Sequence, residues 1–256
     1  MKVRSLGSGT SSGVPRIGND WGACDPAEPR NARTRASILV EHEGTRVLVD
    51  TGPDMRAQLL AAEVGMVDAI LWTHEHADHV FGIDDVRQIF HARGSAVPGY
   101  ARAGTAARLR AQFGYVFEGR DGYPPTVALR TLPDALTIGG IATRVVDQPH
   151  GSITSAGLRF EAGGAAIGYA TDISGMTDAM RALYTGLDVW IVDALRRRPH
   201  PTHPDLATAL RWVQELRPTR TALIHMDQSM DYATLCAELP VGVEPGYDGL
   251  EMEPGR

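Results

Sequence analysis

The chain has 256 residues, of which 43% are hydrophobic and 22% are charged, as in an ordinary globular protein. Its net charge of −6 gives no general attraction to a polyanion such as nucleic acid, and no run of about eighteen apolar residues predicts a membrane span. The two cysteines, Cys24 and Cys236, define no disulfide framework, and the amino terminus shows no secretory signal. We therefore expect a cytoplasmic protein.

The first third of the chain reads as short strands joined by tight turns. Residues 2–6 alternate like a strand and enter a glycine-rich turn at 7–13, which either approaches an anion with its backbone amides or simply connects two elements. Residues 53–64 favour a helix that begins at a proline and is followed by Gly65. Further strands are predicted at 36–41, 45–49 and 69–72.

The middle of the chain is the least regular part of the sequence. A helix predicted to begin at 82 precedes the segment 91–133, which we interpret as an irregular insert and a lid or specificity surface. Within it, 97–100 suggests a strand and 105–113 a helix. Later strands are predicted at 141–146, 155–160, 165–170, 189–192 and 221–225, with a helix from 204 or 205 to about 216. No linker or internal duplication interrupts this pattern, which indicates one domain over residues 1–256.

The stretch 73–79 packs three imidazoles and two carboxylates into seven residues. It follows the apolar strand 69–72, at the strand end where open α/β sheets place their active sites. His74 and His76, two apart in an extended segment, project to the same side and can grip one metal ion, whereas Asp78 and His79 follow a turn and can point at a second ion. Three of the nine histidines within six positions make a chance polar loop a poor explanation, so we predict a metal site.

The pattern His-x-His-x-Asp-His resembles the signature of the metallo-β-lactamase superfamily, and the resemblance runs from near the start of the chain to its end. It implies an α/β fold of the αββα type, with two mixed β-sheets flanked by helices. It also implies ligands after later strands, at His150, Asp172 and His225, which singly would pass for ordinary strand-end or surface residues. Asp50 would orient the metal loop from behind the ligands.

The resemblance implies two divalent ions with one shared ligand. The sets are His74, His76 and His150 for one ion, Asp78, His79 and His225 for the other, and Asp172 bridging both. Zinc or manganese suits these ligands, and iron is also compatible. Two such cations lower the pKa of a bridging water, and the resulting hydroxide attacks phosphorus or a carbonyl carbon. Asp78 is also assigned to catalysis, because Asp78→Ala is expected to abolish activity while the protein still folds.

One further histidine indicates a substrate that contains phosphorus. His203 begins a His-x-Asp-Leu segment at a predicted helix start, where the phosphodiesterase branch of the family, which includes transfer-RNA end-processing enzymes, places a general acid for the leaving oxygen. An imidazole with a reference pKa of about 6.5 suits that task at neutral pH. The alternative for His203 is a helix-capping or loop histidine.

A narrower resemblance comes from residues 6–15 and 245–251, which are similar to the cyclic-phosphate phosphodiesterases of bacterial phosphonate breakdown. Many of those proteins carry a structural zinc in a Cys-x-Cys-x-x-Cys loop with a late histidine. Here the loop retains only Cys24, and Gln228 stands where the histidine would fall. One thiol cannot close a tetrahedral site, so we expect no structural zinc and a loop held by packing of Trp21 or by hydrogen bonds.

These observations predict a dinuclear-metal phosphodiesterase that hydrolyses a small cyclic phosphodiester or nucleotide, with His203 as general acid. The alternatives are transfer-RNA 3′ processing, a carbonyl-directed hydrolase such as a thioesterase or lactonase, and a metal-bound scaffold. The sequence shows no clear basic, glycine-rich arm, so a nucleic-acid partner is disfavoured. No membrane partner is expected, and because the family is often dimeric, a homodimer is compatible with the resemblance.

Overall fold

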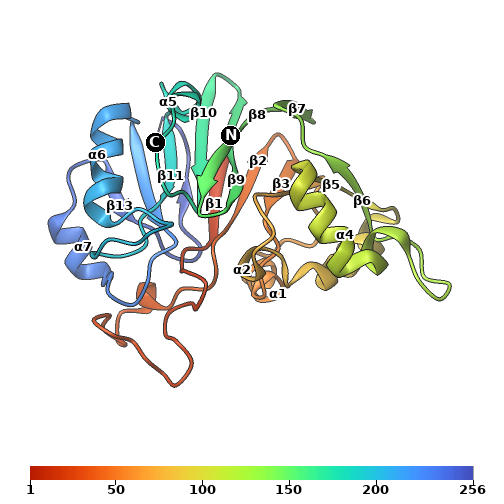
Figure 1. The fold of residues 1–256 in the computed structure, drawn as a ribbon, viewed down its shortest axis with the longest axis horizontal. Helices are drawn as coiled ribbons and strands as arrows, with labels where there is room; N and C mark the ends of the chain where they lie inside the picture. The colour runs from red at the N-terminus through yellow and green to blue at the C-terminus, as the bar shows by residue number, and fades with distance from the viewer. Residues whose placement is uncertain (256) are drawn as a thin grey trace.

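Two seven-stranded β-sheets pack against each other in the computed structural model, which describes residues 1–255 (Figure 1). The first sheet has the order β14 (Glu251–Met252), β1 (Lys2–Gly7), β2 (Ser37–His42), β3 (Thr45–Val49), β4 (Ala69–Trp72), β5 (Val97–Ala101) and β6 (Val127–Thr131). The second has the order β13 (Val243–Pro245), β12 (Arg220–Ile224), β11 (Val189–Asp193), β10 (Ala165–Ala170), β9 (Ile153–Ala162), β8 (Ile141–His150) and β7 (Ala135–Ile138). Both sheets mix parallel and antiparallel pairs. The predicted αββα fold is confirmed.

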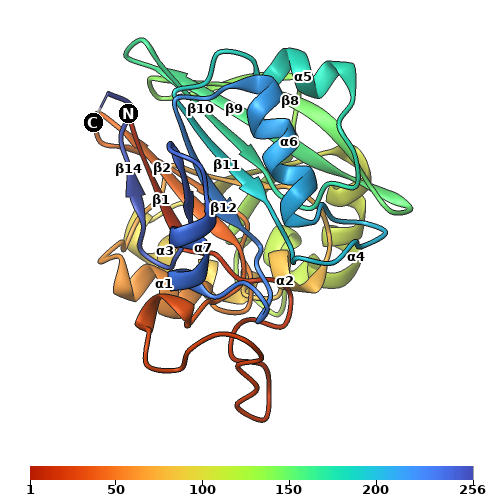
Figure 2. The same ribbon diagram turned by 90° about the vertical axis from the view of Figure 1, so that its left-hand side faces the viewer.

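Helices cover the outer face of each sheet. On the first sheet lie α1 (Met55–Ala61), α3 (Val86–Arg93) and α4 (Ala103–Glu118), with the short α2 (Ala77–Val80) and the 3₁₀ turn η2 (Ile83–Asp85) between them. On the second lie α5 (Asp178–Tyr184), α6 (Leu206–Leu216) and α7 (Tyr232–Glu238). A second 3₁₀ turn, η1 (Pro29–Asn31), belongs to the long loop between β1 and β2, which extends away from the sheets (Figure 2).

Strand β4 shows how the alternation of side chains builds the layers. Leu71 joins the core between the two sheets, whereas Ile70 and Trp72 point to the opposite face and pack under the helices. All four residues of β4 are buried, as expected for a central strand covered on both faces. The strand therefore delivers the residues that follow it, Thr73 to His79, to a fixed place at the edge of the core.

The segment 91–133 is more regular than the sequence indicates, since it contains β5, α4 and β6. The predicted strand and helix are present, but α4 continues to Glu118 past a break in helical dihedral angles at Phe113 (φ −126°, ψ 35°). Strand β6 was missed because it is an edge strand whose last residues are exposed and form no apolar run. The loop rich in glycine and proline is confined to residues 119–126. A role as a lid or specificity surface stays a prediction.

The two ends of the described chain lie side by side. Val3 on β1 pairs with Met252 on β14 at the edge of the first sheet, and Figure 2 shows both ends at one corner of the molecule. Within residues 1–255, no helix combines the length and apolar character needed to cross a membrane.

Candidate metal centre

A buried aspartate holds the stretch that follows β4. Asp50 accepts hydrogen bonds from the backbone amide and hydroxyl of Thr73, both at 2.8 Å, and its Oδ2 lies 2.7 Å from Nδ1 of His79. The contact predicted for Asp50 is therefore present, and it turns Nε2 of His79 away toward the other predicted ligands. Burial opposes a charge on His79, but Asp172, Asp78 and Asp50 raise its pKa well above the usual value.

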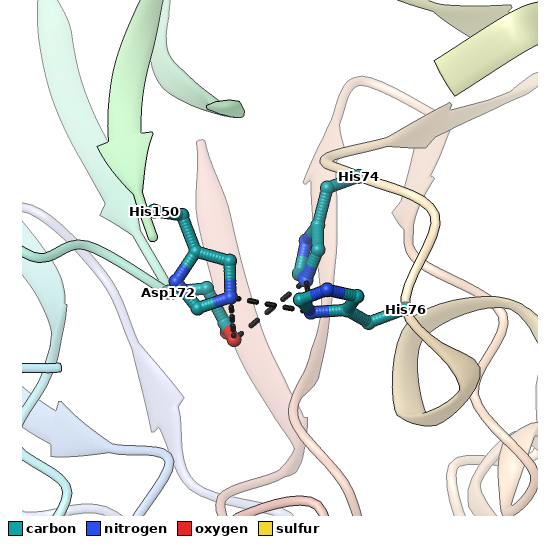
Figure 3. A group of neighbouring side chains, drawn as sticks. All are labelled: His74, His76, His150 and Asp172. Atoms are coloured by element: carbon teal, nitrogen blue, oxygen red, sulfur yellow. Dashed lines mark hydrogen bonds and ion pairs between the residues drawn. The ribbon is translucent and has the colours of Figure 1, made fainter. Parts of the chain in front are cut away.

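Four of the predicted ligands form a first cluster (Figure 3). Nε2 of His74 and Nε2 of His150 lie 3.0 and 3.2 Å from Nδ1 of His76, and Oδ2 of Asp172 lies 3.7 and 3.4 Å from the same atoms of His74 and His150. Burial and the neighbouring His79 hold the pKa of His74 well below its usual value, and burial lowers that of His150. Both are thus kept in the neutral form that binds metal ions.

A second cluster contains Asp78, His79 and His225. Nε2 of His79 lies 3.4 Å from Asp78 Oδ2 and 3.2 Å from Asp172 Oδ1, and Nε2 of His225 lies 3.5 Å from each of these oxygens. Asp172 therefore faces the first cluster with Oδ2 and the second with Oδ1. This is the position predicted for a bridging carboxylate.

The two clusters fit divalent cations. Nε2 of His79 and Nε2 of His225 are buried and make no hydrogen bond, although buried polar atoms almost always have a partner. Each of them faces carboxylate oxygens across a distance that is too long for a hydrogen bond or close to that limit. Imidazole nitrogens and carboxylate oxygens that converge in this way are the donor set of zinc and related ions.

His203 lies beside both clusters. Its ring stacks on that of His225 with centroids 4.8 Å apart, and its Nε2 lies 3.8 Å from Asp172 Oδ2. Its Nδ1 lies 2.7 Å from Oδ2 of Asp193, the last residue of β11. Because Nδ1 of His203 is hydrogen-bonded to Asp193, Nε2 is the nitrogen that faces the ligand clusters.

Asp193 is a site residue that the sequence reasoning missed. It is fully buried, and its Oδ1 lies 3.9 Å from Nδ1 of His225 and has no hydrogen-bond partner. With Asp172, His203 and His225 it forms a third group of converging donor atoms. The signal that identified Asp172, an acid at the end of a short apolar strand, was equally available in Val189–Asp193.

The loop where relatives were expected to hold a structural zinc is tied down by hydrogen bonds. Cys24 is buried beside Arg33, whose Nη1 lies 3.8 Å from its Sγ, and the amide of Ala23 donates to the carbonyl of Gln228 at 2.8 Å. Asn31 donates to Asp231 Oδ2 at 2.8 Å. Among residues 1–255, no group of three potential metal-binding side chains includes Cys24. The expectation of no structural zinc stays a prediction.

Residues 45–226 match the family model of the beta-lactamase superfamily domain. The chain belongs to the metallo-β-lactamase superfamily. It is 35% identical to a structurally characterised diphosphatase of the PhnP family, with a TM-score of 0.89 over 98% of this chain and 97% of that one. Along nearly its whole length the chain is thus similar to a hydrolase of this superfamily.

Two further relatives carry other names. An octanoyltransferase of Porphyromonas gingivalis is 32% identical over 98% of this chain, but this chain spans only 51% of that protein. A ribonuclease Z of a Bradyrhizobium species is 41% identical over 70 residues, which are 27% of this chain and 23% of the enzyme. The names of these relatives describe different reactions.

Proposed function

We propose that this protein is a dinuclear-metal phosphodiesterase that acts on a small cyclic phosphodiester, such as a ribosyl cyclic phosphate or a cyclic nucleotide. The observation that carries the proposal is the position of His203, whose Nε2 faces the ligand clusters while Asp193 occupies Nδ1. A second support is the 35% identity, along nearly the whole chain, to a diphosphatase, an enzyme that acts on phosphorus.

Seven residues would hold the two ions: His74, His76 and His150 for one, Asp78, His79 and His225 for the other, and Asp172 for both. When bound, zinc, manganese or iron ions at such a site lower the pKa of water and neutralise the oxygens of a displacement at phosphorus. We propose two ions per chain. Burial acts to raise the pKa of Asp172, but the neighbouring His225 and His79 outweigh it and hold that pKa well below the usual value.

The protein's own residues supply the proton. In the proposed reaction, His203 as an imidazolium gives the Nε2 proton to the leaving oxygen while the bond from that oxygen to phosphorus breaks. Asp193 keeps the Nδ1 proton in place and stabilises the charged ring before transfer. Stacking on His225 limits the rotation of the His203 ring, so that Nε2 stays directed at the same place.

A small substrate is favoured over transfer RNA. The net charge of −6 works against binding of a polyanion, and the curated relatives named ribonuclease Z match between 22% and 49% of the chain. Transfer-RNA 3′ processing and a carbonyl-directed reaction stay the alternatives. A homodimer, a cytoplasmic location and a single domain over residues 1–256 stay predictions.

The test compares substrates on one preparation of purified protein. Bis(p-nitrophenyl) phosphate, a cyclic nucleotide, a thioester, a β-lactam and a precursor transfer RNA are supplied with manganese or zinc. We expect phosphodiester turnover that chelation abolishes, and His203→Ala to turn over far more slowly while retaining metal. The exposed His91 on α3 provides the control, His91→Ala. Turnover of the thioester or lactam alone, or wild-type rates in His203→Ala, would refute the assignment.

A further inference from the structure

The first cluster is assembled from the two halves of the sandwich. His74 and His76 follow β4 of the first sheet, whereas His150 ends β8 of the second sheet and Asp172 follows β10 (Figure 3). The distances among their donor atoms therefore depend on how the two halves are held beside the site. One direct link is the backbone amide of Ala156 on β9, which donates to the carbonyl of Thr73 at 2.8 Å.

The first turn of α4 supplies a link to the half that contains His150. Arg102, which precedes the helix, donates from Nε to Asp147 Oδ1 at 2.8 Å and from Nη1 to the carbonyl of Leu132 at 2.9 Å. Its Nη2 lies 2.8 Å from Asp134 Oδ1. Asp147 belongs to β8 and stands three residues before His150. Arg102 thus joins β8, the strand that ends at His150, to the start of α4.

The same turn reaches the segment that contains His74 and His76. Thr105 is 4% exposed, and its hydroxyl donates to Glu75 Oε2 at 3.0 Å. In an extended segment alternate side chains point to opposite sides, so Glu75 points away from the cluster that His74 and His76 face. Among the described residues, Thr105 is the only hydrogen-bond partner of the Glu75 carboxylate.

We infer that Arg102 and Thr105 are positioning residues that together set the spacing of the first metal cluster. Arg102 is the residue that caps the start of α4 and Thr105 lies in the first turn of that helix, so one end of one helix joins the His74–His76 segment to the strand of His150. This inference rests on the proposed metal centre. It gives the segment 91–133 a role in holding the site, separate from any contact with substrate.

Thr105→Val tests this role, because valine keeps the shape of threonine and removes the hydroxyl. We expect Thr105→Val to weaken zinc affinity about tenfold, as measured by chelator competition, and to lower kcat with KM little changed. Thr105→Ser keeps the hydroxyl and should restore both. Arg102→Gln should weaken zinc affinity similarly, whereas Arg56→Gln, at an exposed position on α1 with no side-chain partner among the described residues, should match wild type.

Other outcomes distinguish a failure of this inference from a failure of the proposed function. Wild-type zinc affinity and kcat in Thr105→Val would overturn the inference and leave the metal centre intact. A lower melting temperature of the metal-free variant, with unchanged zinc affinity of the folded protein, would also overturn it, because the contact would then serve stability alone. Wild-type protein that binds no zinc or manganese would overturn both the inference and the proposed function.

Discussion

Nδ1 of His203 lies 2.7 Å from Oδ2 of Asp193, a fully buried carboxylate at the end of β11. The other oxygen of Asp193 faces Nδ1 of His225 at 3.9 Å. One side chain therefore stands behind both the proposed acid and one proposed ligand. Carboxylates in this position fix the tautomer and orientation of the imidazoles that they contact.

Asp193→Asn tests the charge of this carboxylate while the shape of the side chain is kept. The amide keeps the volume of the side chain but removes its charge, so the His203 imidazolium loses stabilisation and the ring loses a fixed tautomer. We expect kcat for the phosphodiester to fall about 100-fold or more. Steady-state kinetics and elemental analysis of the metal content would measure this. A variant with wild-type kcat would show that Asp193 has no part in proton transfer.

Asp78→Ala should remove activity without unfolding the protein. Asp78 Oδ2 faces Nε2 of both His79 and His225, so its loss leaves the second ion with two imidazoles and only the shared carboxylate of Asp172. We expect one ion per chain fewer than in wild type and a circular dichroism spectrum that is unchanged. Asp178→Ala, at an exposed position at the start of α5, serves as the control. Full metal content in Asp78→Ala would contradict the assignment of Asp78.

Asp248 should stabilise the folded protein close to the second cluster. It accepts hydrogen bonds from the amides of Ser8 and Thr34 and from both of their hydroxyls, at 2.6 to 2.9 Å. The carbonyl of Ser8 in turn accepts from the amide of Met226, next to His225, at 3.0 Å. Asp248→Ala leaves four donors without their acceptor, and we expect unfolding free energy to fall by about 2–4 kcal/mol. Urea denaturation measures this, and a loss within experimental error would refute it.

Asp231 should make stability depend on acidic pH. Burial acts to raise its pKa, but hydrogen bonds from Thr234, Asn31 and Asp25 outweigh burial and lower it. A carboxylate with a lowered pKa in the folded state stabilises the protein above the unfolded value of about 3.9, and this contribution is lost as pH falls further toward the folded-state value. Asp231→Asn should therefore show a smaller loss of unfolding free energy than wild type below about pH 4. If the unfolding free energy fell equally steeply with pH in both proteins below pH 4, this prediction would be contradicted.

The side chains that the sequence proposes as ligands lie together in the structure, although their binding of metal stays a prediction, whereas several surrounding elements were missed. His150 ends a strand, whereas Asp172 and His225 come just after one. Because these strand ends meet at a common edge of the sandwich, residues far apart in the chain converge. By contrast, the pairing of Asp193 with His203 depends on the path of the loop that links β11 to α6. Periodicity does not encode that path. The contact of Thr105 with Glu75 likewise joins residues 30 positions apart and needs the docked position of α4.

Two helices that the sequence did not predict, α5 and α7, share a physical cause. Helix α7 is short, and its start depends on a local cap, in which Asp231 accepts a hydrogen bond from the amide of Thr234. Helix α5 begins in the same way at Thr177, which accepts from the amide of Met180. Short helices are marginal by themselves and form because they pack against a sheet, so their apolar pattern covers too few residues to stand out.

The burial of β4 on both faces has a consequence for motion at the site. Ile70 and Trp72 pack in the core between the first sheet and its helices, whereas Leu71 packs in the core between the two sheets. In addition, Nε1 of Trp72 donates a hydrogen bond to the hydroxyl of Thr51 at 2.9 Å. The strand cannot shift without disturbing two packed layers at once. Its amide hydrogens should therefore exchange with solvent only through global unfolding, whereas those of residues 119–124 should exchange through local opening. The proposed ligands that follow β4 are thus anchored to a strand that is buried along its whole length.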